Sequence, residues 1–206
     1  MKIDAHYYAV LAFCRACGFD KESACTVAYA SQFVDDAKIN HVIIEGHIPG
    51  GVQYDTIEGK PSFFNMATCH SYTRIKTFNY SAMINNTSAF HFVPGCNGKH
   101  FVKQLRCMEE GPVITGILKE ALLEDDLVKL GIVLHAYADT FSHQGFSGLL
   151  SKVNDIEQVQ ILNGSGIVAD KFKFILKWLK DAVSERLDLL IPAYGHGQAM
   201  VYPDLP

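Results

Sequence analysis

Apolar residues recur at intervals of three and four along most of the chain, which is the pattern of helices that bury one face. Near the N-terminus, Asp4 is expected to cap a helix over residues 5–17 that Gly18 closes. Asp20 is expected to cap the next helix, which ends in the segment SQFVDDAK (31–38). The predicted apolar face of this second helix consists of Ala24, Val27, Ala28, Ala30, Phe33 and Val34.

The second half of the chain continues the helical pattern. Pro112 suits the first turn of a helix over residues 113–123, and the acidic residues 124–126 break the chain and cap a further helix that stops at Gly145. We expect these two helices to pack against each other. A last amphipathic helix is predicted over residues 168–190.

The middle of the chain departs from this pattern. HVIIEGHI (41–48) is short and β-branched, which is typical of a strand or an extended connector, and the Gly-containing segment 50–62 is predicted to be a loop. Residues 63–80 favour a helix that carries His70, whereas residues 78–100, rich in Asn, Ser, Gly and aromatics, are predicted to be irregular. Long loops in compact domains often line a functional site.

Composition narrows the class of protein. With 49% hydrophobic and 19% charged residues and no evident linker, the 206 residues are predicted to form one mainly α, multi-helix domain (1–206) with long irregular loops. A net charge of −4 with scattered Lys and Arg disfavours nucleic acid as an obligate partner. The sequence lacks the pattern of a signal peptide or a transmembrane segment, so we expect a cytoplasmic protein, with its oligomeric state left open.

Cysteine usage adds little chemistry. Six cysteines in a chain of this length do not indicate a disulfide scaffold. Cys14 and Cys17 form a CxxC, but within a helical pattern and without a thioredoxin-like context. We interpret them as core or surface thiols, and keep a thiol-based redox protein as a third alternative.

The segment LGIVLHAYADTFSHQGFSG (130–148) is the strongest chemical signal. It places His135, Asp139 and His143 at successive i, i+4 positions, so three side chains stack along about 12 Å of one helix face. Imidazole and carboxylate are ligands of zinc and of other divalent transition metals. A third ligand one turn further along fits the same ion only with strain and serves a second ion more readily.

The alternative for this segment is a set of core or capping histidines that pair with Asp139 through hydrogen bonds. We favour a metal, because a carboxylate between two histidines on an apolar helix is costly to bury without a cation. One helix supplies too few ligands for a hydrolytic site. The further candidates from other parts of the chain are His6, Asp35, Asp36, His70 and His91.

The pair Asp35 and Asp36 is unusual because carboxylates at a helix C-terminus oppose the helix dipole by about 0.3–1 kcal/mol each. A compensating cation or a simple solvated turn would explain the pair equally well. Other enzyme signatures are missing: there is no HD dyad, HExxH, GxSxG or GxxxxGK[ST]. GSGIVA (164–169) matches a dinucleotide-binding turn only superficially, since no βαβ unit surrounds it.

Five segments carry a family resemblance: MKIDAHYYAV, AYASQFVDDA, AFHFVPG, HAYADTFSHQGFSG and YGHGQAMVYPDLP. In order and across nearly the whole chain they resemble the uncharacterised bacterial DUF6765 family. The HxxxDxxxH segment is also similar to the zinc-dependent phospholipase C and P1 nuclease superfamily, which implies a helical fold that holds a cluster of zinc ions with His and Asp from several helices. Those enzymes usually place the second His further from the Asp than His143 is from Asp139.

Applied to this sequence, the resemblance implies a metal cluster held by His6, Asp35, Asp36, His70, His135, Asp139 and His143, with His91 as a further candidate and no role assigned to His196. Members of the family often continue beyond the segment that matches YPDLP, so a missing portion is expected to affect activity more than metal binding.

The sequence therefore predicts a metal-dependent hydrolase that acts on a small-molecule or phosphoester substrate. The predicted metal is zinc or another divalent transition metal, and the site could hold more than one ion. Asp36 and Asp139 are the candidate catalytic residues, with Asp35 as an alternative to Asp36. The competing prediction is a non-enzymatic helical binding or structural module whose His/Asp cluster only stabilises the fold.

Overall fold

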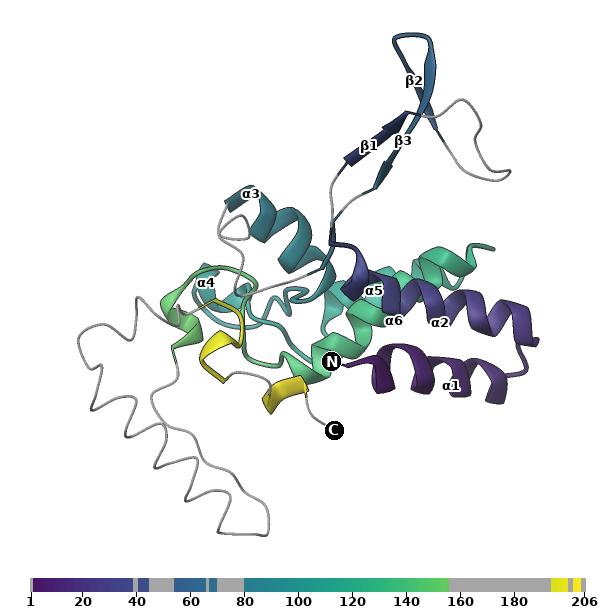
Figure 1. The fold of residues 1–206 in the computed structure, drawn as a ribbon. Helices are drawn as coiled ribbons and strands as arrows, with labels where there is room; N and C mark the ends of the chain where they lie inside the picture. The colour runs from purple at the N-terminus through teal and green to yellow at the C-terminus, as the bar shows by residue number, and fades with distance from the viewer. Residues whose placement is uncertain are drawn as a thin grey trace.

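Figure 1 presents the fold in a computed structural model that describes residues 2–38, 41–44, 54–65, 67–69, 80–155, 194–199 and 202–204. The α-helices are α1 (Val10–Ala16), α2 (Lys21–Asp36), α3 (Tyr80–Ala82), α4 (Phe101–Gln104), α5 (Pro112–Ala121) and α6 (Leu127–Ser142). The short π- and 3-10-helical segments are η1 (Asp4–Ala9), η3 (Met83–Ser88), η4 (Lys152–Asn154), η5 (Gly197–Ala199) and η6 (Tyr202–Asp204). The mainly α prediction is confirmed, while His70 and the predicted helix 168–190 lie outside the described residues.

The first helix differs at its start from the prediction. Asp4 does not cap it: the residue already lies inside the π-helical segment η1, which continues into α1. The predicted end is confirmed, since Gly18 has φ +92 and donates its N–H to the Arg15 carbonyl while the N–H of Phe19 bonds to the Cys14 carbonyl. These two bonds form a Schellman motif.

Helix α2 begins as predicted, with the Asp20 carboxylate accepting from the Ser23 N–H at 2.9 Å. Its buried face contains Ala24, Val27, Ala28, Ala30, Ser31 and Val34. Phe33 was predicted in this face but is exposed, because the 100° rotation per residue carries it past the buried stripe. The face packs on α6 and, with Val10 and Cys14 of α1, forms one core cluster.

Gly131 sets how closely α2 and α6 approach. A Cβ at position 131 would contact the Val27 carbonyl oxygen and lie 2.7 Å from the Cβ of Ala30, so only glycine fits without displacing a helix. Asp35 and His135 follow this crossing point by one helical turn on their respective helices, counted from Ser31 and Gly131. The tight crossing therefore brings a carboxylate of α2 to an imidazole of α6.

Helices α5 and α6 follow the sequence prediction. Pro112 occupies the first turn of α5, and the Asp126 side chain caps α6 by accepting from the N–H groups of Val128 and Lys129. The two helices pack through a second core cluster that contains Val93, Ile114, Ala121, Val133 and Ala136.

The predicted loop 50–62 contains a hairpin instead. The strands β1 (His41–Ile44), β2 (Asp55–Ile57) and β3 (Lys60–Asn65) form an antiparallel sheet in the order β1-β3-β2, which projects from the helices in Figure 1. Glu58 (φ 51) and Gly59 (φ 77) make the two-residue turn, a backbone conformation that glycine favours at the second position. The predicted strand at 41–48 is confirmed over its first four residues, and the rest lies outside the described part.

Two further predictions for the middle of the chain were wrong in the described residues. Phe63, Phe64 and Asn65 belong to strand β3 rather than to a helix over 63–80. Residues 80–90, predicted to be irregular, are helical through α3 and η3, and they bury Met83 and Thr87 one turn apart. His91 follows Thr87 by four residues, so this helix delivers it to the interior.

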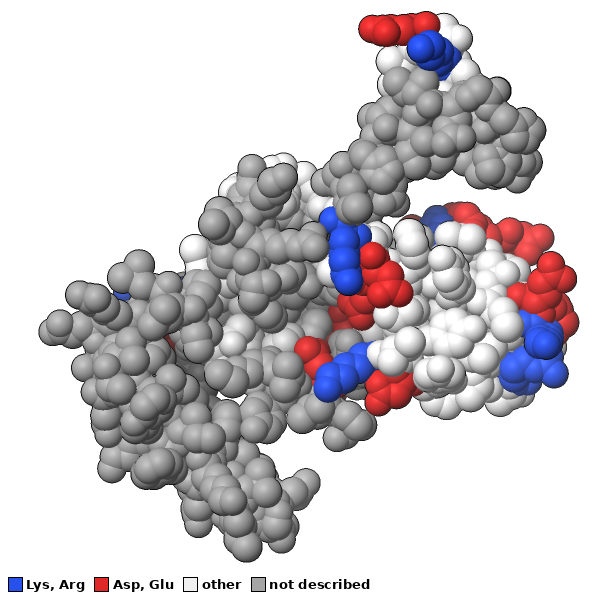
Figure 2. All heavy atoms as spheres, viewed as in Figure 1, with Lys and Arg blue, Asp and Glu red and all other residues white. Residues whose placement is uncertain are grey.

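Charge is distributed unevenly over the face seen in Figure 2. Acidic side chains, with basic ones beside them, gather where the C-terminal end of α2 lies, and a second charged group lies at the other end, where α1 connects to α2. The surface between these two groups is largely uncharged. The exposed aromatic residues of η1, α1 and α2 include Tyr8, Phe13, Tyr29 and Phe33. In the part of the chain that the structure describes, no helix combines the length and apolarity that a bilayer crossing requires.

Candidate metal centre

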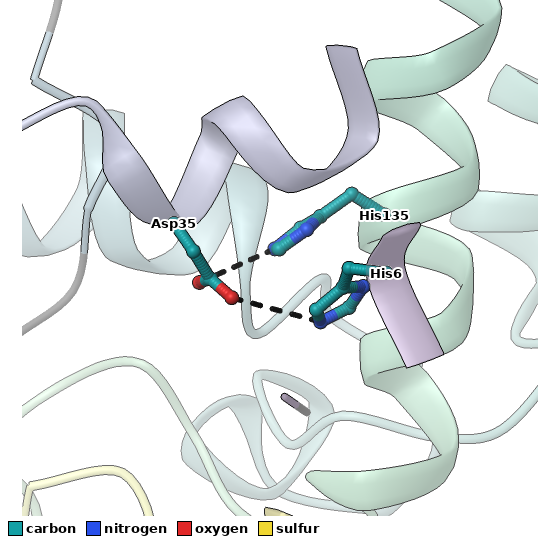
Figure 3. Close-up of side chains that lie close together, drawn as sticks. All are labelled: His6, Asp35 and His135. Carbon is teal, nitrogen blue, oxygen red and sulfur yellow. Dashed lines mark ion pairs between the residues drawn. The ribbon is translucent and has the colours of Figure 1, made fainter. Parts of the chain in front are cut away.

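Three helical segments direct one side chain each toward a common point. Figure 3 shows His6 from η1, Asp35 from α2 and His135 from α6 converging. The Asp35 Oδ2 atom lies 3.9 Å from His6 Nε2, and its Oδ1 atom lies 3.9 Å from His135 Nε2. The two imidazole rings stack with centroids 3.8 Å apart. Residues distant in sequence therefore meet in one polar cluster inside the helical core.

Asp139 and His91 complete this cluster. Asp139 Oδ1 lies 3.1 Å from His6 Nε2, while Oδ2 lies 3.0 Å from His91 Nδ1 and 3.3 Å from His135 Nε2. His91 Nδ1 also lies 3.8 Å from Asp35 Oδ1. We define the central site as His6, Asp35, His91, His135 and Asp139.

The central site is buried on every side except at Asp35. His6, His135 and Asp139 have no exposed surface and His91 is 2% exposed, whereas the Asp35 side chain is 29% exposed. Asp35 is therefore the most exposed of the five central residues.

The chain after the hairpin orients His91. The Thr68 carbonyl accepts a hydrogen bond from His91 Nε2 at 2.8 Å, and the Thr68 hydroxyl donates to the Val34 carbonyl at 2.7 Å. Since Nε2 carries the proton, a neutral His91 presents the lone pair of Nδ1 to the Asp139 carboxylate. A lone pair facing a carboxylate at 3.0 Å is repulsive, so either a proton or a cation must lie between them.

Protonation in the central site is uneven. Burial lowers the pKa of His135 to about 4, so this imidazole is neutral near pH 7. Burial opposes charge on His91 as well, but its hydrogen bond to Asp139 and the charges of Asp139 and Asp35 raise its pKa overall. Burial would raise the pKa of Asp139, yet the surrounding imidazoles, His143 and His135 first, hold it well below the usual range.

The nitrogens at the far side of two rings have no hydrogen-bond partner among the described residues. His6 Nδ1 and His135 Nδ1 are buried and accept or donate no hydrogen bond within the described structure. Such unsatisfied buried groups cost about 1–3 kcal/mol each. The strong polar contacts of both rings are therefore concentrated on their Nε2 atoms, which face the two carboxylates.

The two carboxylates divide their oxygens in the same way. One oxygen of each faces His6, namely Oδ1 of Asp139 and Oδ2 of Asp35, and the other oxygen of each faces the pair His91 and His135. Ligand atoms around a tetrahedral zinc ion, with bonds of about 2.0–2.1 Å, lie about 3.3 Å apart. The separations of 3.0–3.9 Å between imidazole nitrogens and carboxylate oxygens bracket that value. Two groups of this donor set could therefore hold a divalent ion, His6 with Asp35 and His135, and His91 with His135 and Asp139.

The predicted ligands are only partly brought together. His6, Asp35, His135 and Asp139 meet in the central site, whereas the neighbouring Asp36 is exposed and belongs to none of the ligand groups found among the described residues. His70 lies outside the described residues. His91, only a further candidate from the sequence, is a central member.

His143 leaves the central site because α6 ends before it. The residue is the C-cap of α6, with φ −96, and its Nδ1 atom donates to the His91 carbonyl at 2.6 Å. Its Nε2 atom instead faces Asp204, 3.2 Å away, and His196 lies on the other carboxylate oxygen at 3.4 Å. Asp204 and His196 had no predicted role, because no periodic pattern links them to α6.

The two cysteines of the CxxC lie in different surroundings. Cys14 and Cys17 are both free, the first buried and the second exposed. Burial, with a smaller contribution from Cys17, raises the pKa of Cys14. The raised pKa of Cys14 is the opposite of the lowered pKa that is typical of a reactive thiol.

The fold and the buried His/Asp cluster define a helical protein with the donor set of a metal centre. Residues 1–206 match the model of DUF6765, a family of unknown function, and the protein belongs to this family. The predicted family is thereby confirmed. Comparison with the curated proteins found no match, and comparison with the solved structures found none either.

Proposed function

We propose that the protein is a metal-dependent hydrolase of phosphoesters whose central site holds two divalent transition-metal ions, zinc being the first candidate. The observation that supports this proposal is the shared division of the Asp35 and Asp139 oxygens. His6 with one oxygen from each carboxylate would hold the first ion. His91 and His135 with the remaining oxygens would hold the second.

The shared ligand His135 is the reason for proposing this division. His135 belongs to two three-residue ligand groups, one with His6 and Asp35 and the other with His91 and Asp139. One imidazole nitrogen has one lone pair and binds one ion, so His135 cannot serve both groups. Carboxylates have two oxygens and can bridge, which leaves three protein ligands on the His6 side and four on the other.

The ligand count indicates where chemistry takes place. Catalytic metal sites keep a position open beside three protein ligands, whereas four ligands close a site. When bound, such ions lower the pKa of a water toward about 7 and stabilise negative charge developing on a phosphoryl group. We assign proton acceptance to Asp35, the ligand that reaches solvent, and a bridging role to the fully buried Asp139. Asp36, on the exposed side of α2, has no part in this mechanism.

The predicted similarity to the zinc-dependent phospholipase C and P1 nuclease superfamily rests on the HxxxDxxxH segment. It remains a prediction, and it is consistent with the same substrate class.

Deep burial favours a second candidate, a structural metal site without catalysis. His6, His135 and Asp139 have no contact with solvent, as in sites where a metal only stabilises a fold. Turnover separates the two candidates. Hydrolysis of phosphomonoesters, phosphodiesters or phospholipids that Asp35→Asn abolishes, without loss of folding, supports the enzyme; a metal-loaded protein inactive on the whole panel supports the structural role.

Elemental analysis of untagged protein tests metal binding itself. Each molecule is expected to hold at least two equivalents of metal after zinc incubation, two of them in the central site. A content below about a tenth of an equivalent after the same incubation would eliminate the hydrolase proposal and the structural metal site together.

A further inference from the structure

A second polar cluster lies where α6 ends. We define the tail site as His143, His196 and Asp204, whose ligand atoms lie within 4.8 Å of one another. His143 Nε2 faces Asp204 Oδ1 at 3.2 Å, and His196 Nε2 faces Oδ2 of the same carboxylate at 3.4 Å. Three separate segments contribute to it: the end of α6, residues 194–199 and η6.

The orientation of His143 is fixed by its surroundings. Its Nδ1 atom donates to the His91 carbonyl at 2.6 Å, and its ring stacks on Phe92 with centroids 4.3 Å apart and an interplanar angle of 13°. The Nε2 atom of a neutral His143 therefore carries a lone pair directed at Asp204. Burial to 3% exposure leaves little room for water to separate the two.

Two arrangements satisfy this cluster. The rings of His143 and His196 stack at 4.8 Å, so two imidazolium ions side by side would repel each other. In the first arrangement only His143 is protonated and donates to Oδ1, while a neutral His196 donates from Nε2 to Oδ2. The second arrangement is a bound cation. One divalent ion would accept both nitrogens and a carboxylate oxygen at once.

We propose that His143, His196 and Asp204 form a separate site for one divalent transition-metal ion, of the zinc type, that fastens the segments 194–199 and 202–204 to the end of α6. This site goes beyond the proposed hydrolase and does not depend on it. Its donor set of two imidazoles and one carboxylate matches zinc, with a fourth position left for water.

The tail site is connected to the central site without sharing a ligand. His143 bonds to the carbonyl of His91, whose ring belongs to the central site, and His143 Nδ1 lies 3.7 Å from Asp139 Oδ2. An ion in the tail site would fix the backbone that presents His91. Its role is therefore to hold a segment in place, while the open coordination position and the solvent-facing Asp35 belong to the central site.

Counting bound zinc by native mass spectrometry tests this proposal. Asp204→Asn keeps the side-chain volume but weakens the ligand, so it is expected to bind one equivalent less than the wild-type protein. Asp204→Glu retains a carboxylate and is expected to keep the ion. His196→Asn should match Asp204→Asn, and His100→Asn, which changes an exposed histidine, should match the wild type. Equal zinc counts in the wild type, Asp204→Asn and His196→Asn would overturn the proposal and leave a His–Asp hydrogen-bonded cluster.

A measurement on the wild-type chain removes dependence on how the variants fold. Side-chain nitrogen NMR is expected to show the Nε2 signals of His143 and His196 shifting when zinc is added, while Nδ1 of His143 keeps its proton. Unchanged Nε2 signals at zinc saturation would contradict the tail site. If Asp35→Asn loses the ions of the central site but keeps these shifts, the tail site binds zinc independently of the central site.

Discussion

The central site and the tail site use the same residue types but are built on different supports. Four of the five central residues lie on helical segments, and the Gly131 crossing fixes the distance between two of them. The tail site takes Asp204 from the three-residue segment η6 and His196 from a turn, about 60 and 50 residues beyond His143 in the sequence. Helices position ligands through local hydrogen bonds, whereas turns depend on distant contacts, so the central site should tolerate less change and lose less order without metal.

Asp139→Ala tests the central site most severely. Asp139 has hydrogen bonds or close contacts with His6, His91 and His135, and its removal should abolish zinc binding in the central site. It also leaves a buried cationic imidazole without its partner, so the free energy of unfolding should fall by about 3 kcal/mol or more. Urea unfolding and zinc counts measure both effects. Wild-type stability together with full zinc content would refute the position assigned to Asp139.

The single substitutions Asp35→Asn and Asp36→Asn compare the roles of two adjacent acidic residues. Asp35 contacts three histidines of the central site, whereas Asp36 is exposed. Zinc affinity should fall about 100-fold in Asp35→Asn, a loss typical of a weakened ligand set, and stay within about twofold in Asp36→Asn. Competition with a chelator of known affinity reports both. If Asp36→Asn has the larger effect, the helix face assigned to the site is wrong.

Gly131→Val tests whether the helix crossing sets the central geometry. The added side chain meets the Val27 carbonyl and Ala30, so α2 and α6 must separate. We expect a loss of about 1–3 kcal/mol in unfolding free energy and about tenfold weaker zinc binding at the central site. The tail site should keep its ion, because its ligands do not depend on the crossing of α2 and α6.

A matched control uses Gly116, which lies in α5 and has open space where a Cβ would stand. Gly116→Ala should stabilise the protein by up to about 1 kcal/mol without altering zinc binding. Equal effects at positions 116 and 131 would argue against close packing as the cause.

Thr68→Val should have the smallest effect of the series. It removes the hydroxyl that donates to the Val34 carbonyl but leaves the Thr68 carbonyl that orients His91. The expected loss is about 1 kcal/mol of stability, with zinc affinity reduced less than about tenfold. Thermal melting with and without zinc measures it. A complete loss of metal binding would mean that segment 67–69 supplies more than orientation.

Local signals in the sequence predicted the helices and part of the site. Asp20, Pro112 and Asp126 mark helix starts through capping chemistry that needs no distant partner. The i, i+4 spacing of His135 and Asp139 likewise determines a shared helix face. On α2, the buried positions 28 and 31 lie on the same helix face as Asp35 but not as Asp36. Helical periodicity alone would therefore have selected Asp35 over Asp36 as the inward-facing carboxylate.

What escaped prediction depends on long-range contacts or on unusual backbone. The Glu58–Gly59 turn makes a hairpin of very short strands, and the polar η3 segment is helical although it is rich in Asn and Ser. There, Asn86 donates to the Ala67 carbonyl, a contact that exists only after the chain has folded. If that helix had been predicted, the four-residue spacing of Met83, Thr87 and His91 would have placed His91 on its buried face. Asp204 has no comparable signal, since its partners lie far away in the sequence.

Anomalous diffraction at the zinc edge, from crystals of untagged protein incubated with zinc, determines whether the central site holds two ions. We expect two peaks about 3.5–4 Å apart, the spacing of paired metal ions, one beside His6 and one between His91 and His135, with Asp35 and Asp139 between the two peaks. A central site with no anomalous peak, its histidines and carboxylates joined by hydrogen bonds alone, would contradict this expectation.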